Sequence, residues 1–288
     1  MLNFKIKKKE IEKPIIQGAM GVGISLGELS GAVAKEGAMG TISMVGIGYK
    51  EADYYNNPLQ ANQRAFRKEL AKARDIAGGK GLIGANIMVV LTDYEGLVKE
   101  AVAQKVDYIV SGAGLPLNLT ELVEDEDILL APIVSSARAL KLINRVWQKK
   151  HNRLPDFVVL EGSGAGGHLG FKRDEIEKGK SLEELTKDVV EYLEEVKQAT
   201  GQTIPLFVAG SVYDGSDLKK YRDLGATGLQ IGSRFIGTFE CDADERFKNF
   251  VIDSKEEDLV IIQSPVGILG RAINNQFLKE IALERRPS

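Results

Sequence analysis

Residues that could do chemistry are concentrated in one short stretch of the sequence, from Glu161 to Gly170. It reads Glu-Gly-Ser-Gly-Ala-Gly-Gly-His-Leu-Gly and includes His168, one of the two histidines of the chain. Glycine gives a loop access to positive φ and leaves room for another group to press against bare main chain. An imidazole changes charge near neutral pH and can donate or accept a proton. The stretch therefore predicts a loop that binds a flat or anionic ligand through backbone N–H groups, with His168 as the candidate catalytic residue.

The run from Phe157 to Leu160 comes directly before this loop and is entirely apolar. It predicts a strand buried on both faces, which is typical of parallel sheets. α/β folds place their sites where such strands end. The alternative, an ordinary flexible turn with a structural His168, stays open. His151, which lies among charged residues, is interpreted as a solvated loop residue.

The composition limits the classes of function. A chain of 288 residues with 43% hydrophobic residues suits one α/β barrel. A net charge of −3 gives no basic footprint, so nucleic acid is not expected as a partner. Cys241 is the single cysteine, which excludes an intrachain disulfide, and with two histidines no metal site is expected.

Two further absences concern the location of the protein. The first ten residues carry charges but no apolar segment of a secretory signal. No apolar stretch approaches the roughly 20 residues that a membrane-spanning helix needs. We therefore expect a cytoplasmic protein with no membrane partner.

Short apolar runs alternate with longer amphipathic segments along most of the chain. The apolar runs predict eight strands, at 14–17, 40–43, 82–86, 107–110, 129–133, 157–161, 205–209 and 228–232. The intervening segments predict helices at 26–35, 59–77, 94–104, 136–149, 182–199 and 216–224, with a less regular link at 117–124. Strands that alternate with helices form parallel sheets, and eight such units favour closure. The sequence thus predicts an α/β fold, a (β/α)8 TIM barrel, in a single domain over 1–288.

The tail, about 242–288, is expected to form a helical extension that packs on the barrel. It contains a predicted helix at 243–251, an apolar and glycine-containing segment at 261–271, and a final helix. The segment from Ser264 to Arg271 either closes over the site or only packs against the barrel. Its glycines and Arg271 favour closure.

The residues at the ends of the predicted strands are mainly glycine, serine and amides. In a barrel these ends face the site, and the scarcity of carboxylates there argues against sugar or metal chemistry. The amide of Asn86 can donate and accept, as recognition of a flavin or pyrimidine edge requires, although Asn86 could instead cap the next helix.

The last two predicted strands indicate where a phosphate would bind. Many barrels hold a phosphate in the loops after strands seven and eight, on main-chain N–H groups and a helix N-terminus. Small residues suited to this task follow these strands: Gly210, Ser211, Gly232 and Ser233. Ordinary βα turns are the alternative, and Arg234 either pairs with the phosphate or fixes the rim.

Taken together, several motifs resemble those of the nitronate monooxygenase family, once called 2-nitropropane dioxygenases. They span roughly residues 14 to 240 and comprise Pro14-Ile-Ile-Gln-Gly-Ala-Met20, Gly84-Ala-Asn86, Glu161-Gly-x-x-Ala-Gly-Gly-His-x-Gly170, Ala209-Gly210 and Gln230-Ile-Gly-Ser-Arg234. FMN-dependent enoyl-acyl-carrier-protein reductases and some NADH:quinone reductases share this pattern. The Ala-Gly-Gly-His motif is its most specific part.

The resemblance implies a barrel that holds non-covalent FMN at the strand ends, with His168 as the catalytic residue beside the flavin. The implied FMN contacts are Ala19, Met20, Asn86, Glu161, Gly166, Gly167, Gly210, Ser211, Gln230, Ile231, Gly232 and Ser233. The chain departs from the common pattern at Ala19 and Ser211, where glycine is usual, and at Ser233, where threonine is usual. All three residues are small, so cofactor binding is expected to survive.

The function implied first is the oxidation of alkyl nitronates with O2 to carbonyl compounds and nitrite. An NAD(P)H-dependent enoyl-thioester or quinone reductase on the same flavin barrel is the second reading. A barrel that binds a phosphorylated metabolite without flavin is the third. The partners expected are a small-molecule substrate with O2 or NAD(P)H, and a homodimer stays open.

Overall fold

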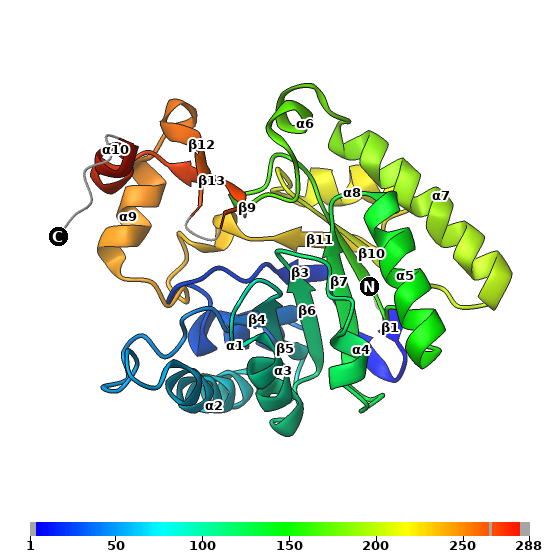
Figure 1. Cartoon of the computed structure of the whole chain (residues 1–288), viewed down its shortest axis with the longest axis horizontal. Helices are drawn as coiled ribbons and strands as arrows, with labels where there is room; N and C mark the ends of the chain where they lie inside the picture. Colours follow the sequence, from blue (N-terminus) through cyan, green and yellow to red (C-terminus); the bar gives the residue numbers. More distant parts are fainter. Residues whose placement is uncertain (1–3, 265–266, 283–288) are drawn as a thin grey trace.

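Eight parallel strands form a closed barrel at the centre of the computed structural model, which describes residues 4–264 and 267–282 (Figure 1). Around the barrel the strands follow the order β10-β11-β3-β4-β5-β6-β7-β8. Their bounds are β3 Ile15–Gln17, β4 Met39–Ser43, β5 Leu82–Met88, β6 Tyr108–Gly112, β7 Leu129–Val134, β8 Val158–Glu161, β10 Leu206–Ala209 and β11 Gly228–Ile231. Every one of the eight predicted strands is present, and the predicted (β/α)8 barrel is confirmed.

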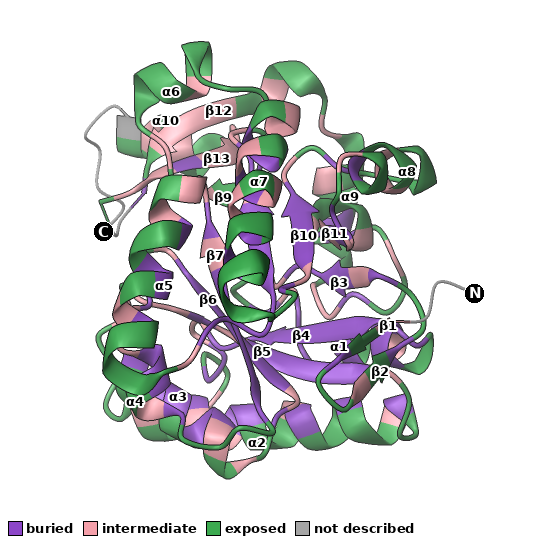
Figure 2. Cartoon of the chain, turned by 90° about the vertical axis from the view of Figure 1, so that its right-hand side faces the viewer, coloured by how far each residue is buried: buried purple, intermediate pink, exposed green. Residues whose placement is uncertain are grey.

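Helices connect these strands and cover the outside of the barrel, with their buried faces turned inward (Figure 2). They are α1 Gly27–Lys35, α2 Pro58–Ala77, α3 Tyr94–Ala103, α4 Leu119–Leu122, α5 Ala137–His151, α7 Leu182–Thr200 and α8 Gly215–Asp223. A further helix before α7, α6 Arg173–Lys178, has no buried residue. The predicted link at 117–124 contains only the single turn of α4, and α6 was not predicted. His151 is exposed as expected, but it ends α5 instead of lying in a loop.

The boundaries of α7 illustrate how local sequence sets these helices. At its start Ser181 Oγ accepts the N–H of Glu184 at 3.2 Å, while the Glu184 carboxylate accepts the N–H of Ser181 at 2.8 Å. This reciprocal capping satisfies two backbone donors that have no partner inside the helix. The helix ends at Gly201, whose φ of 75° is a conformation that glycine adopts without strain.

Aromatic side chains fill the half of the barrel interior that lies away from the carboxyl ends of the strands. The ring of Phe157 packs edge-on against Tyr108 and Phe207, with centroid distances of 5.7 and 5.6 Å. The hydroxyl of Tyr108 donates to Gly40 O at 2.8 Å and contacts Thr41 Oγ1 at 2.7 Å, so its polar end is satisfied. This half of the barrel is therefore a solid core.

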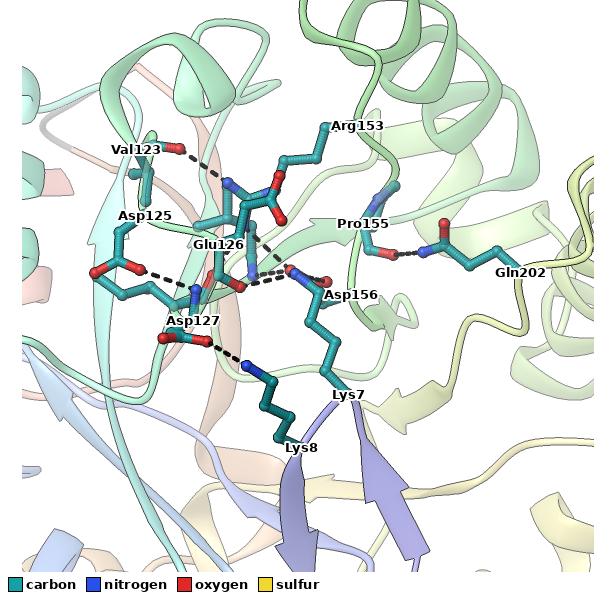
Figure 3. Close-up of polar contacts among 12 residues, drawn as sticks. Lys7, Lys8, Val123, Asp125, Glu126, Asp127, Arg153, Pro155, Asp156 and Gln202 are labelled. Atoms are coloured by element: carbon teal, nitrogen blue, oxygen red, sulfur yellow. Dashed lines mark hydrogen bonds and ion pairs between the residues drawn. The ribbon is translucent and has the colours of Figure 1, made fainter.

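An N-terminal hairpin, β1 Phe4–Ile6 and β2 Lys9–Ile11, closes the amino end of the barrel. Its turn residue Lys7 binds Asp156 Oδ1 at 2.7 Å and Glu126 O at 3.0 Å (Figure 3). The Asp156 carboxylate is buried and also accepts the N–H of Leu130 at 2.8 Å. Arg153 adds bonds to nearby carbonyls. This network fixes the hairpin against the aromatic core at the amino end of the barrel. The glycine-rich loop 162–170, called the glycine loop below, lies at the opposite end.

The C-terminal extension contains strands as well as helices. Its elements are α9 Glu245–Asp253, β12 Leu259–Gln263, β13 Leu269–Ile273 and α10 Gln276–Ala282. The antiparallel pair β12–β13 continues into β9 Gly167–His168, a two-residue strand inside the glycine loop (Figures 1 and 2). The helices of the extension were predicted, but this three-stranded sheet was not. Positions 265 and 266 of the predicted closing segment lie outside the described residues.

Within residues 4–264 and 267–282, no helix is both long and apolar enough to cross a membrane.

Candidate functional site

Strand alternation directs three polar side chains into the barrel at its carboxyl end. On β8, Phe157 and Val159 belong to the interior core, and Glu161 has the same parity. On β5, a side chain at Gly84 would meet the ring of Tyr108, so Asn86, two residues on, faces the same interior.

The third inward residue is Gln230 on β11. A side chain at Gly228, two residues earlier, would meet the Phe207 ring, which places this parity inside the barrel. Ala209 pairs with Glu161 on one side and with Gln230 on the other. Glu161 and Gln230 therefore flank one small residue in the same layer, just above the aromatic core.

Burial raises the pKa of Glu161 to about 7. Glu161 is half-buried, and its carboxylate has no hydrogen bond or ion pair within the described part of the chain that would offset the partial loss of hydration. A carboxyl group of this kind holds its proton close to neutral pH. It can act as a hydrogen-bond donor there, which an ordinary glutamate cannot.

Asn86 is half-buried and lies within β5, two residues before the strand ends, and α3 starts at Tyr94 with Asp93 as its N-cap. The alternative that Asn86 caps the next helix is therefore wrong. Its amide makes no hydrogen bond to any described residue and remains free to bind a ligand edge.

The loop after β8 packs against the loop after β10. Gly162 donates its N–H to Ala209 O at 2.9 Å, and Ser211 Oγ donates to Gly164 O at 3.1 Å. Ser211 has a φ of 60°, a left-handed conformation that costs a non-glycine residue energy. A side chain at Gly164 would collide with the Ser211 hydroxyl. The Ser211 hydroxyl can therefore occupy this place only because residue 164 is a glycine.

Beyond this contact the loop presents bare backbone. A Cβ at Gly166 or Gly167 would meet no atom within 4 Å, and Gly167 has a φ of 73°. Here the glycines leave open space instead of accommodating the protein's own side chains. The predicted room beside the main chain is therefore present at these two positions.

His168 follows immediately and is half-buried. Burial lowers the pKa of its imidazole below the ordinary value of 6.5. A neutral imidazole is thus the main form near pH 7, and it can accept a proton. The loop around it is held on both sides: Leu169 donates its N–H to Leu269 O at 2.8 Å, and Ser135 Oγ donates to Gly170 O at 2.9 Å.

Several backbone N–H groups in the loops after the neighbouring strands β10 and β11 have no acceptor within the residues described. They include those of Ser211, Ser233 and Arg234. The N-terminus of α8, by contrast, is occupied by its own Asp214, which accepts the N–H of Ser216 at 2.8 Å. Unsatisfied N–H groups at such a corner suit an anionic group such as phosphate. The Arg234 guanidinium lies 4.2 Å from the centroid of the Tyr213 ring, on the surface beside this corner.

The loop after β3 completes the rim, with Ala19 and Met20 both half-buried. Gln17, which the sequence analysis did not single out, holds this loop in place. Its side chain donates to Ser25 Oγ at 2.9 Å and accepts the N–H of Thr41 at 2.9 Å, and Ser25 Oγ in turn accepts the N–H of Met20. Two signals could have found it: an amide at the end of a strand, and its place in the motif Pro14 to Met20.

Ile231 differs from its neighbours among the predicted contacts. Its side chain belongs to the hydrophobic layer between the barrel and the helices, and its carbonyl accepts the N–H of Gly18 at 2.7 Å. The structure therefore does not bring its side chain to the rim. Gly232, the next residue, lies beside Met20.

The sequence model of the protein family described as nitronate monooxygenase matches residues 3–287 of this chain. A probable nitronate monooxygenase of Staphylococcus aureus (strain Newman) is 32% identical over 130 residues, which are 44% of this chain and 34% of the relative. The match thus spans about a third of the length of that curated relative.

Two solved structures share the fold. FabK from Thermotoga maritima has a TM-score of 0.72 at 24% identity, over 94% of this chain and 74% of that one. A nitroalkane oxidase from Streptomyces ansochromogenes has a TM-score of 0.73 at 19% identity, over 94% and 79%. With the family model covering nearly the entire sequence, the chain belongs to the nitronate monooxygenase family.

Proposed function

We propose that this protein is an FMN-dependent oxidoreductase, and specifically a nitronate monooxygenase that oxidises alkyl nitronates with O2 to carbonyl compounds and nitrite. One observation carries the proposal. Unpaired N–H groups, open glycine backbone and a half-buried imidazole occur together on the carboxyl rim of one barrel. That combination suits a cofactor with a phosphate at one end and a flat ring at the other.

The residues that would hold FMN divide by chemistry. The free N–H groups that follow β10 and β11 would bind the phosphate, assisted by Gly232, which leaves room for it. Gly166 and Gly167 would lie against the flat part of the cofactor, and the backbone of Ala19 and Met20 would border it. Asn86, Glu161 and Gln230 would meet its polar edge from inside the barrel. When bound, FMN supplies the electron transfer that no side chain can carry out.

His168 would act on the substrate. Because its imidazole is mainly neutral near pH 7, it can accept the proton from the carbon next to a nitro group and so convert a nitroalkane to its nitronate. With a substrate that is already a nitronate, no proton needs to leave. The neutral imidazole would then donate a hydrogen bond to the anion through its ring N–H, and the bond would be charge-assisted only in the minor, protonated form.

The visible absorbance spectrum of the purified protein tests this proposal. We expect flavin absorbance that is bleached by anaerobic addition of an alkyl nitronate and returns on admission of air, with release of nitrite. Bleaching by NADH or NADPH but not by nitronate would support an enoyl-thioester or quinone reductase instead. A protein that is colourless and does not bind added FMN would contradict both and leave a barrel for a phosphorylated metabolite.

A further inference from the structure

The extension reaches the candidate catalytic residue through backbone pairing. In the sheet formed by β12, β13 and β9, Gly270 lies opposite His168 and Arg271 lies opposite Gly167. The bond from Leu169 N to Leu269 O, 2.8 Å long, extends this pairing by one residue. The strand β13, about a hundred residues away in the sequence, thus pairs directly with the backbone of His168.

Arg271 adds a side-chain contact to the same loop. Its Nη1 donates to Ser163 O at 2.7 Å and to Ala165 O at 2.9 Å. Both carbonyls belong to the glycine-rich loop, which has high backbone freedom when nothing holds it. A guanidinium is planar and permanently charged, so it can hold two carbonyls in one fixed arrangement.

Arg271 and His168 project from opposite faces of this sheet. Cross-strand partners share a face and successive residues alternate, so Arg271 lies on the face of Gly167 and His168 lies on the face of Gly270. Gly270 has no side chain, which leaves space opposite the imidazole. The effect of Arg271 on His168 is therefore carried by the loop backbone.

A second contact joins the extension to the rim. The carboxylate of Asp242 accepts the N–H groups of Leu26 at 2.8 Å, Glu28 at 3.1 Å and Leu29 at 3.2 Å, at the start of α1. The loop after β3 is thus anchored to the beginning of the extension, and the glycine loop is anchored near its end.

We propose that Arg271 is a positioning residue, which fixes the glycine loop so that the His168 imidazole is held in its reactive place. The inference rests on the proposed function, in which His168 acts on the substrate. It assigns to the extension a part in catalysis that does not require contact with the substrate.

Three variants test the proposal: Arg271→Ala, Arg271→Lys and the control Gln263→Ala. Gln263 donates to Gly267 O at 2.6 Å inside the same hairpin, so the control removes a hydrogen bond without touching the glycine loop. The first measurement is hydrogen exchange of the peptide covering 162–170, in protein without substrate. We expect exchange about tenfold faster in Arg271→Ala, an intermediate rate in Arg271→Lys and an unchanged rate in Gln263→Ala.

The second measurement is steady-state turnover of an alkyl nitronate, together with the flavin content. We expect Arg271→Ala to retain FMN and to lose about 100-fold in kcat while KM changes little, because a small misplacement of a reacting group lowers the rate more than binding. Added guanidinium ion should restore part of the kcat of Arg271→Ala. It should not affect Gln263→Ala.

The outcomes separate the two claims. If hydrogen exchange of the 162–170 peptide is unchanged in Arg271→Ala, Arg271 does not fix the glycine loop. If exchange is faster but kcat is unaltered, Arg271 fixes the loop without positioning His168 for catalysis. Should Arg271→Ala fail to fold, the same two measurements on Arg271→Lys decide. A wild-type protein that binds no flavin would instead refute the proposed function. The hydrogen-exchange data would still show whether Arg271 fixes the glycine loop.

Discussion

The hydroxyl of Ser211 donates a hydrogen bond to the backbone oxygen of Gly164 over 3.1 Å, and it occupies the space that a side chain at position 164 would need. Ser211 has a φ of 60°, a conformation that glycine favours. The serine is accommodated because the facing loop carries no side chain at 164. The serine in this left-handed conformation is thus matched by a glycine in the facing loop.

This pairing predicts a compensating double substitution. Gly164→Ala should weaken FMN binding about tenfold or more and lower the thermal midpoint, because the added methyl group forces the two loops apart. Ser211→Gly alone should change stability by only about 1 kcal/mol, since it loses one hydrogen bond but relieves the positive φ. The double variant should recover most of the loss.

Fluorescence titration with FMN and thermal unfolding of all four proteins complete the cycle. Additive effects of the two substitutions would show that the loops do not depend on each other here.

Replacement of His168 by alanine should leave FMN bound and reduce turnover of nitroalkanes by about 10²–10⁴-fold, the usual contribution of a general base. His151→Ala is the matched control, because that side chain is exposed at the end of α5. Turnover of a neutral nitroalkane and of its nitronate should be measured separately. Full activity of the His168 variant on both substrates would remove this residue from the mechanism.

Glu161 predicts a specific pH dependence of stability in the protein without cofactor. Its pKa rises from the ordinary value of 4.5 to about 7 on folding, so the folded state binds more protons than the unfolded state between these values. The free energy of unfolding therefore falls as the pH rises through this window, by up to about 3 kcal/mol.

Glu161→Gln should flatten this fall, because the amide imitates the protonated acid at every pH. Urea unfolding at pH values below and above the window measures the difference. Equal slopes for wild type and variant would mean that the carboxyl group is hydrated in the folded state.

The network at the amino end of the barrel should contribute to stability and not to catalysis. Lys7→Met removes a cation that lies 2.7 Å from the buried carboxylate of Asp156, and we expect a loss of about 2 kcal/mol. Lys8→Met is the control. That lysine and Asp127 are both largely exposed and 3.6 Å apart, so the loss should stay below about 0.5 kcal/mol. Chemical unfolding of both variants, with turnover measured alongside, checks this. Equal losses would contradict the role assigned to Asp156.

The sequence by itself determined the barrel and the location of its rim. All eight strands could be predicted because each buried parallel strand is a local apolar run bounded by turn residues. The glycine loop could be recognised because so many glycines lie close together in it. The inward direction of Glu161 also follows from local alternation, once Phe157 and Val159 are known to face the core.

The tertiary structure alone decided the relationships between distant segments. The pairing of Gly270 with His168, the bonds from Arg271 to the glycine loop and the fit of Ser211 against Gly164 join residues about 50 to 100 positions apart. No local periodicity encodes such contacts, because they depend on which surfaces the closed barrel brings together. The raised pKa of Glu161 has the same origin, since it follows from burial by neighbours that only the completed fold supplies.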